Sequence, residues 1–231
     1  MKAVIATLSA ASALFAIGGF NESDLIKARD HQDKAALEKI VNDFKAAADK
    51  DSKDAVAQYR LALAESYTAE VAIETHDKTA AKTAAQSGID AAQRAVDLKP
   101  DRSEYQRILG TLCGQAISGM GLAGLKFGKC ALSAVDKAIE LDPKSSINYV
   151  SHGVGNYYLP QALGGGYELA IKDFRKALEL NPKNADAYLW LGVALRKVNQ
   201  MDEARKAIAK SLELNPNRAW AKQQLDKTPA N

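Results

Sequence analysis

Hydrophobic positions along the chain recur at helical spacing, and four segments end in the same phrase. In each, a small residue, an aliphatic residue, an acid, a leucine and a polar residue precede a proline. The four phrases lie at 95–100, 138–143, 177–182 and 211–216, with their prolines 43, 39 and 34 residues apart. Proline has no backbone N–H and cannot continue a helix, so each phrase predicts the end of a helix. The pattern therefore predicts an all-α chain built from a repeated unit.

A second amphipathic stretch precedes each phrase and carries small residues at fixed places. In the four units in turn, this stretch contains the residue pair Leu63-Ala64, Leu109-Gly110, His152-Gly153 and Leu191-Gly192. Further along each unit comes another small residue, in turn Gly88, Ala131, Ala170 and Ala204. Small residues that face each other let two antiparallel helices approach closely. Each unit is thus predicted to be a helical hairpin.

This pattern resembles the tetratricopeptide repeat (TPR) family, whose unit of 34 residues is a pair of helices. The last unit fits the family pattern without a gap, at Tyr188, Leu191, Gly192, Leu195, Ala204, Ile208, Ser211 and Pro216. The three earlier units fit with extra residues that lengthen the helices or lie between them. The resemblance implies a right-handed solenoid of antiparallel helix pairs, with about four repeats, an N-terminal half-repeat and a C-terminal cap helix.

The repeats divide the chain into successive segments. We expect an N-terminal helical half-repeat at 22–53 and a cap helix at 217–227. The four repeats are expected at 54–100, 101–143, 144–182 and 183–216, the third with a glycine-rich insert at 159–166. A weak cap would also allow copies of the chain to stack end to end.

The N-terminal segment is typical of a secretory signal peptide at 1–19. Lys2 is followed by an uncharged stretch at 3–20, and small residues at Ala16 and Gly18 permit cleavage before Gly19. The alternatives are an uncleaved anchor or the buried first helix of a cytosolic protein. We expect export, to the periplasm or the outside of the cell. No other segment approaches the length of a membrane span.

Cys113 and Cys130 are the only cysteines, and both fall in the second repeat. Each is expected on one of two antiparallel helices, and an exported chain meets an oxidising environment. A disulfide is one interpretation. The other is a pair of buried thiols that act as small hydrophobic residues.

The sequence offers little that could carry catalysis or hold a cofactor. A glycine pattern at Gly119–Gly124 has the spacing of a dinucleotide-binding loop, but it follows a predicted helix instead of a strand. The histidines are His31, His76 and His152, too far apart to form a metal-ligand pair at helical spacing. His152 is interpreted as a structural residue, because no nucleophile or orienting acid is evident beside it. We expect no enzyme activity, no cofactor and no metal.

Composition narrows the class of partner. Hydrophobic residues make up 47% and charged residues 26% of the chain, which is typical of a globular protein. The net charge of +3 is too small to indicate nucleic-acid binding. The expected partner is therefore a protein or a peptide.

By the resemblance, the first helix of each repeat lines the concave face of the solenoid. The expected partner-binding residues are Arg107, Val150, Val154, Tyr157, Tyr158, Leu189, Trp190, Val193, Arg196 and Lys197. The family's clamp for a C-terminal carboxylate needs Lys and Asn where this chain has valine and leucine, so chaperone-tail binding is not implied. An apolar centre with cations on both flanks instead predicts a non-catalytic scaffold that binds a peptide or a helix.

Two alternatives remain open at this point. The helix at 33–48 could fold back and cover the groove, since large apolar patches are seldom exposed. The chain could also be a small-ligand carrier or an accessory of an envelope transport system, with a pocket under Gly164–Gly166 walled by Tyr157 and Tyr158.

Overall fold

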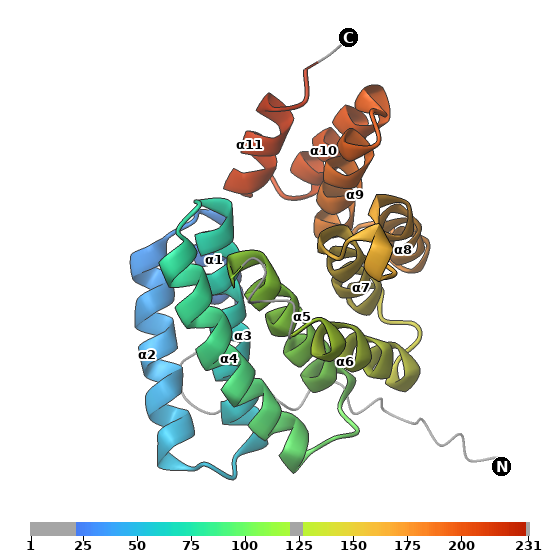
Figure 1. The fold of residues 1–231 in the computed structure, drawn as a ribbon. Coiled ribbons are helices and arrows are strands. Elements are labelled where there is room, and N and C mark those ends of the chain that lie inside the picture. The colour runs from blue at the N-terminus through green and yellow to red at the C-terminus, as the bar shows by residue number, and fades with distance from the viewer. Residues whose placement is uncertain (1–21, 121–126, 230–231) are drawn as a thin grey trace, which may run out of the picture.

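The computed structural model describes residues 22–120 and 127–229, and every regular element within them is helical (Figure 1). The α-helices are α1 (Glu22–Asp30), α2 (Lys34–Lys50), α3 (Ala55–Glu74), α4 (Lys78–Leu98), α5 (Ser103–Met120), α6 (Gly128–Leu141), α7 (Ser146–Tyr158), α8 (Tyr167–Leu180), α9 (Ala185–Lys197), α10 (Met201–Leu214) and α11 (Ala219–Asp226). A short 3-10 helix, η2 (Gln161–Leu163), lies between α7 and α8. The predicted all-α class is confirmed.

The four proline phrases end four helices at the same place in the phrase. Helices α4, α6, α8 and α10 all stop at the leucine, two residues before the proline. Helix starts have their own signal, an acid or amide that caps the first free backbone N–H groups. Asp54 accepts from the amides of Val56 and Ala57, and Asn184 accepts from the amide of Ala187.

The helices form two layers that curve around a hollow. The inner layer consists of the first helix of each pair, α3, α5, α7 and α9, and each contacts the next. The outer layer consists of α4, α6, α8 and α10, each packed against its own partner. Helix α2 packs against α3 and does not line the hollow, so it does not cover the groove as one alternative proposed.

Small residues let the two layers touch. A Cβ atom built on Gly192 would lie 2.5 Å from Ile208 Cγ1 and 2.7 Å from the Ala204 carbonyl oxygen. On Gly110 it would lie 2.5 Å from Val135 Cγ2. No real Cβ approaches other atoms so closely, so the helices could pack this way only with glycine at these positions.

A disulfide joins the two helices of the second pair. Cys113 on α5 and Cys130 on α6 are bonded, with their Cα atoms 6.0 Å apart. Of the two interpretations of these cysteines, the structure shows the bridge.

The two ends of the array meet, which the sequence did not predict. The start of α11 lies against α1 and α3 (Figure 1). Arg218, just before α11, is 1% exposed, and its guanidinium donates to Glu70 at 2.7 Å and to Glu74. Arg29 at the end of α1 donates to Asp186 on α9 at 2.9 Å. These contacts close the curved array into a ring, and we call these residues, together with Asp30, the closing cluster.

Two predicted features fall outside the described residues. They are the signal peptide at 1–19 and most of the glycine pattern at Gly119–Gly124. Among the helices that the structure does describe, none combines the length and the apolar character needed to cross a bilayer.

Candidate functional site

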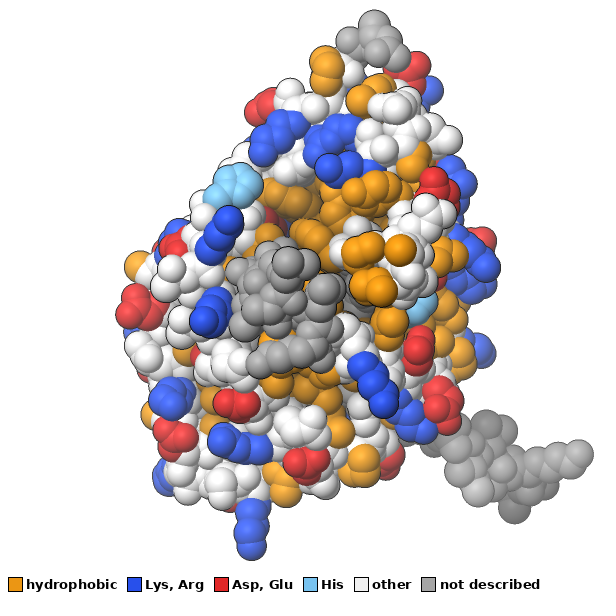
Figure 2. Space-filling model, in the orientation of Figure 1, with side chains coloured by type: hydrophobic (Ala, Val, Ile, Leu, Met, Phe, Trp, Pro, Cys, Tyr) orange, Lys and Arg blue, Asp and Glu red, His pale blue; other side chains and the backbone are white. Residues whose placement is uncertain are grey.

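The ring encloses a cavity of about 370 Å³ on its concave side. The inner helices α3, α5, α7 and α9 line it, α11 adds Trp220 and Gln224, and Arg29 of α1 completes the wall. Figure 2 shows hydrophobic side chains gathered in the hollow between the N-terminal helices and the α7–α9 side, with lysine and arginine side chains beside them. The candidate site is therefore the inside of the ring.

Nine of the ten predicted partner-binding residues line this cavity. They are Arg107, Val150, Val154, Tyr157, Tyr158, Trp190, Val193, Arg196 and Lys197. Leu189 does not: it is 0% exposed and packs in a core cluster with Ile208 and Trp220. Leu189 shares a face of α9 with Val193 and Arg196, which do line the cavity, but it is covered by its neighbours: it packs against Ile208 of α10 and Trp220 of α11.

Aromatic side chains form one side of the cavity. The rings of Tyr157 and Trp190 have centroids 5.6 Å apart, and Trp190 and Trp220 are 4.8 Å apart. Tyr158 meets both Tyr157 and Trp190 edge-on. Burial raises the pKa of Tyr157 to about 12, so its hydroxyl is neutral at physiological pH. This wall offers aromatic surface to an apolar or aromatic group.

The acidic side chains of the wall belong to the closing cluster. Burial raises the pKa of Asp186, but the charges of Arg29 and Arg218 outweigh it, and the net shift is downward. Glu74 behaves differently: its side chain is 3% exposed, and burial raises its pKa to about 7 despite the opposing charge of Arg218. Asp186 is thus ionised at neutral pH, whereas Glu74 titrates there.

The cavity also has cationic groups on two flanks. Arg107 projects from α5 and is 8% exposed. Arg196 and Lys197 project from the end of α9, and Lys227 follows α11. Arg196 is held by the carbonyl and side-chain oxygens of Gln224. The sequence had predicted that Arg107 lies on one flank of the apolar wall and that Arg196 and Lys197 lie on the other.

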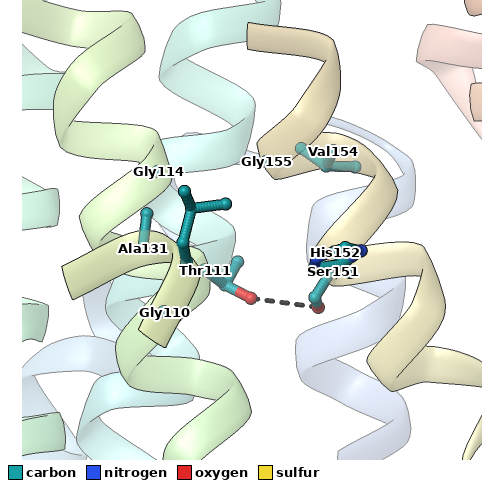
Figure 3. Close-up of a pocket in the computed structure, with 9 residues that line it drawn as sticks. Gly110, Thr111, Gly114, Ala131, Ser151, His152, Val154 and Gly155 are labelled. Carbon is teal, nitrogen blue, oxygen red and sulfur yellow. Dashed lines mark hydrogen bonds between the residues drawn. The ribbon is translucent and has the colours of Figure 1, made fainter. Parts of the chain in front are cut away.

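A separate, much smaller gap lies between α5 and α7 (Figure 3). It measures about 20 Å³ and is bordered by Gly110, Gly114 and Gly155, which supply no side chains to fill it. The hydroxyls of Thr111 and Ser151 bridge the two helices at 3.1 Å. Its volume suits about one water molecule, so it is not a ligand site.

His152 beside this gap has two acids next to it, whereas the sequence had shown no orienting acid there. Its Nδ1 lies 2.8 Å from Asp173 Oδ2 on α8, and its Nε2 lies 3.4 Å from Asp136 Oδ1 on α6. Asn156 also donates to Asp173, at 2.8 Å. The hydrogen bond to Asp173 raises the pKa of His152 against the effect of burial. The imidazole thus joins three helices of neighbouring repeats.

The glycine-rich insert does not contribute to the cavity. Gly164 and Gly166 have positive φ values of 89° and 128°, which a residue with a side chain rarely adopts. The amide of Gly166 donates to the Asn156 carbonyl and so ties the insert to the end of α7. Tyr157 and Tyr158, which one alternative placed around a pocket under Gly164–Gly166, line the larger cavity, and those glycines are not part of its wall.

Sequence reasoning missed the part of the wall that comes from the ends of the chain. These residues are Arg29, Tyr67, Glu70, Glu74, His76, Trp220 and Lys227. The first repeat fits the family pattern most loosely, so its inward positions were not assigned. A signal was available in α11, where Trp220 is an aromatic residue on an otherwise polar cap.

The described residues contain no group of three or more His, Cys, Asp or Glu side chains placed to hold a metal ion. The cavity instead combines aromatic and aliphatic surface with charged groups. Such a lining suits recognition by contact and charge.

Comparisons with known proteins match both halves of the chain. Residues 20–162 match the family model described as regulator of microtubule dynamics protein 1-3. Residues 163–199 match a model described as TPR repeat, and residues 185–218 match one described as tetratricopeptide repeat. The predicted relation to this repeat family is confirmed.

Individual relatives match less than half of this chain. Small glutamine-rich tetratricopeptide repeat-containing protein 2 of Mycosarcoma maydis is 32% identical over 95 residues, which are 41% of this chain and 26% of that protein. The protein STIP1 homolog of Dictyostelium discoideum is 31% identical over 96 residues, 42% of this chain and 16% of that protein. The chain thus spans about a quarter or less of the length of these relatives.

Among solved structures, the thermophilic TPR protein TTC0263 of Thermus thermophilus has a similar fold. The two superpose with a TM-score of 0.64 at 16% identity, covering 90% of this chain and 97% of that one. At this level of identity the likeness extends to the fold alone.

Proposed function

The chain belongs to the family described as regulator of microtubule dynamics protein 1-3 and carries tetratricopeptide repeats, and from this premise we propose that it is a non-catalytic scaffold. Its ring captures a short segment of a partner protein in the central cavity. The observation that carries the proposal is the continuous apolar and aromatic wall that α7, α9 and α11 present to the hollow.

The size of the cavity suits a short segment of a partner protein. Ligand pockets typically measure ~300–1,000 Å³, and the cavity lies near the lower limit at about 370 Å³. The ring therefore has room for a few side chains of a partner segment.

A charge placed in the apolar wall tests the proposal. Val154 is half-buried at the surface of the cavity, so Val154→Glu leaves the core intact and should abolish capture of the partner. Leu98→Glu is the matched control, because Leu98 is 40% exposed at the end of α4 and does not line the cavity. Leu189→Glu is unsuitable, since that side chain is fully buried and its loss would unfold α9.

The measurement is affinity purification from the native source, followed by mass spectrometry. We expect a set of proteins to be recovered with the wild-type chain and the Leu98→Glu variant but lost with Val154→Glu, while circular dichroism shows equal helicity. An identical set with all three chains would contradict the proposal.

A small-ligand carrier is the second candidate function, and the place of the cavity inside the ring favours it. The closing cluster joins α1 and α3 to α9 and α11, so the hollow is bounded by helices around the ring. Native mass spectrometry of the purified chain distinguishes the candidates. A bound small molecule that is absent from Val154→Glu would favour the carrier, and a ligand-free chain that captures proteins would favour the scaffold.

We also propose that the chain is exported. The uncharged segment at 3–20 and the bridge between Cys113 and Cys130 support this, because disulfides persist in oxidising compartments. An exported chain would not meet microtubules, which the family description names. Intact mass from the native source decides the matter: a chain that begins at Gly19 with no free thiol supports export, and a longer chain with two thiols contradicts it.

A further inference from the structure

The charged groups of the cavity wall fall into two classes. Each acid has a cation beside it: Glu70 and Glu74 pair with Arg218, and Asp186 pairs with Arg29. The remaining cations of the wall have no carboxylate within 4 Å among the described residues. They are Arg107, Arg196, Lys197 and Lys227. The surplus charge facing the hollow is therefore positive.

Arg107 is the most buried of these cations. It is 8% exposed, and its guanidinium lies by the hydroxyl of Tyr59, a neutral group. A neutral hydroxyl returns only part of the hydration energy that a buried charge loses. A carboxylate that enters the cavity would supply a counter-ion, and a guanidinium can bind both of its oxygens.

The apolar wall lies between the cationic flanks. Arg107 is on α5, and Arg196 and Lys197 are on α9. Helix α7 lies between α5 and α9 and contributes Val154 and Tyr157 to the wall. A ligand that contacts the apolar wall and both cationic flanks needs an apolar group with a negative charge on each side of it.

We propose that the occupant of the cavity is an acidic segment of a partner protein in which one apolar side chain lies between two carboxylates. The inference rests on the scaffold function proposed above and adds the chemistry of the partner. One carboxylate binds Arg107, the aliphatic or aromatic side chain packs on Tyr157 and Trp190, and the second carboxylate lies by Lys197. An amphiphile with a charge at one end alone would satisfy one flank and leave the other unpaired.

A random library of eight-residue peptides displayed on phage tests the inference with the full chain as bait. We expect enrichment of peptides with Asp or Glu on both sides of an aliphatic or aromatic residue. Both tryptophans of the chain, Trp190 and Trp220, line the cavity, so binding of a synthetic enriched peptide is followed by intrinsic tryptophan fluorescence. Binding should weaken as salt is raised.

Three variants locate the effect. Arg107→Gln should lower the affinity for the acidic peptide at least tenfold, and Arg107→Lys should restore part of it. Arg94→Gln removes the same charge from an exposed site on α4 and should change the affinity less than twofold. Thermal unfolding of each variant verifies that the fold is retained.

The outcomes separate this inference from the proposed function. If enriched peptides shift the tryptophan signal but show no preference for acids, or bind Arg107→Gln as well as wild type, the chemistry assigned here is wrong and the scaffold function stands. If no peptide is enriched, or if a single-headed anionic detergent shifts the signal and no peptide does, both are overturned.

Discussion

Contacts between the two helices of a repeat and contacts that close the ring use different chemistry. Neighbouring helices meet through small and apolar residues, as where Gly192 touches Ile208 and Gly110 touches Val135. The ends of the array meet through buried charges, as where Arg218 inserts between Glu70 and Glu74. The first kind of contact recurs in every unit, whereas the second occurs once.

The difference explains what each kind of contact contributes. Apolar packing between neighbours supplies most of the free energy of folding and fixes the curvature of the array. A buried ion pair contributes little net stability, because the cost of removing charges from water offsets their attraction. It does, however, penalise every arrangement in which a partner is missing. The closing cluster thus selects one closed shape for the ring, and that shape encloses the cavity.

The largest expected effect comes from removing the buried cation of the closing cluster. Arg218→Ala leaves the buried Glu74 and the partly exposed Glu70 without their cation, which should lower the free energy of unfolding by about 3–5 kcal/mol. Arg175→Ala is the contrast, because its pair with Glu203 joins α8 to α10 with both side chains about half exposed, and it should cost less than about 1 kcal/mol. Urea titration measures the free energy of unfolding of both variants. An equal loss in the two would contradict the distinction between the buried and the exposed ion pair.

Packing between neighbours gives the next effect. Gly192→Leu forces α9 away from α10 and should cost about 1–3 kcal/mol. Gly114→Ala is the control, because no atom lies within 4 Å of a Cβ built there. It should gain about 0.5–1 kcal/mol from the higher helix propensity of alanine. Thermal unfolding that ranks the two variants in the opposite order would show that the helix phase assigned to the last repeat is wrong.

The closing cluster should also respond to pH. The pKa of Glu74 rises from an ordinary 4.5 to about 7 in the folded chain. The folded state keeps this proton where the unfolded state has lost it, so stability falls as the pH rises from about 4.5 through about 7. Glu74→Gln mimics the protonated form. Its stability relative to the wild type should therefore increase as the pH rises from about 5 to about 8. The measurement is the melting temperature of both chains as a function of pH. A difference between them that stays constant across that range would exclude this role of Glu74.

His152 gives the smallest effect and represents the contacts between neighbours. Its pKa is raised in the folded chain, chiefly by the hydrogen bond to Asp173. The protonated form therefore stabilises the fold below its ordinary pKa of 6.5, and this contribution is lost as the pH rises through the folded value. His152→Gln should cost about 1 kcal/mol near pH 6 and less near pH 9. A cost independent of pH would mean that the imidazole acts by shape alone.

The repeated part of the fold could be predicted from the sequence because it is periodic. The proline phrases indicated the ends of α4, α6, α8 and α10, and the small residues marked the hairpins. The same regularity identified nine wall residues from the first helices. Leu189 was misplaced because the cap helix α11, whose Trp220 packs against it, buries that part of α9.

The closure of the ring could not be predicted in this way. Arg29 and Asp186 are 157 residues apart, and Arg218 lies 144 residues from Glu74. Single charged residues on a helix carry no periodic signal, and in the sequence they are indistinguishable from charges that face solvent. The cap helix was expected only to end the array, whereas its Trp220 and Gln224 form part of the cavity wall.

The distance between α1 and α11 tests most directly whether the chain is a closed ring. Spin labels on cysteines introduced at the exposed positions Lys27 and Lys222 leave the native bridge in place and report this distance by double electron–electron resonance. The closed ring predicts one short, narrow distribution for the wild-type background and a broad, longer one for Arg218→Glu. A broad, long distribution in the wild-type background would show that the array is open and that the enclosed cavity does not exist.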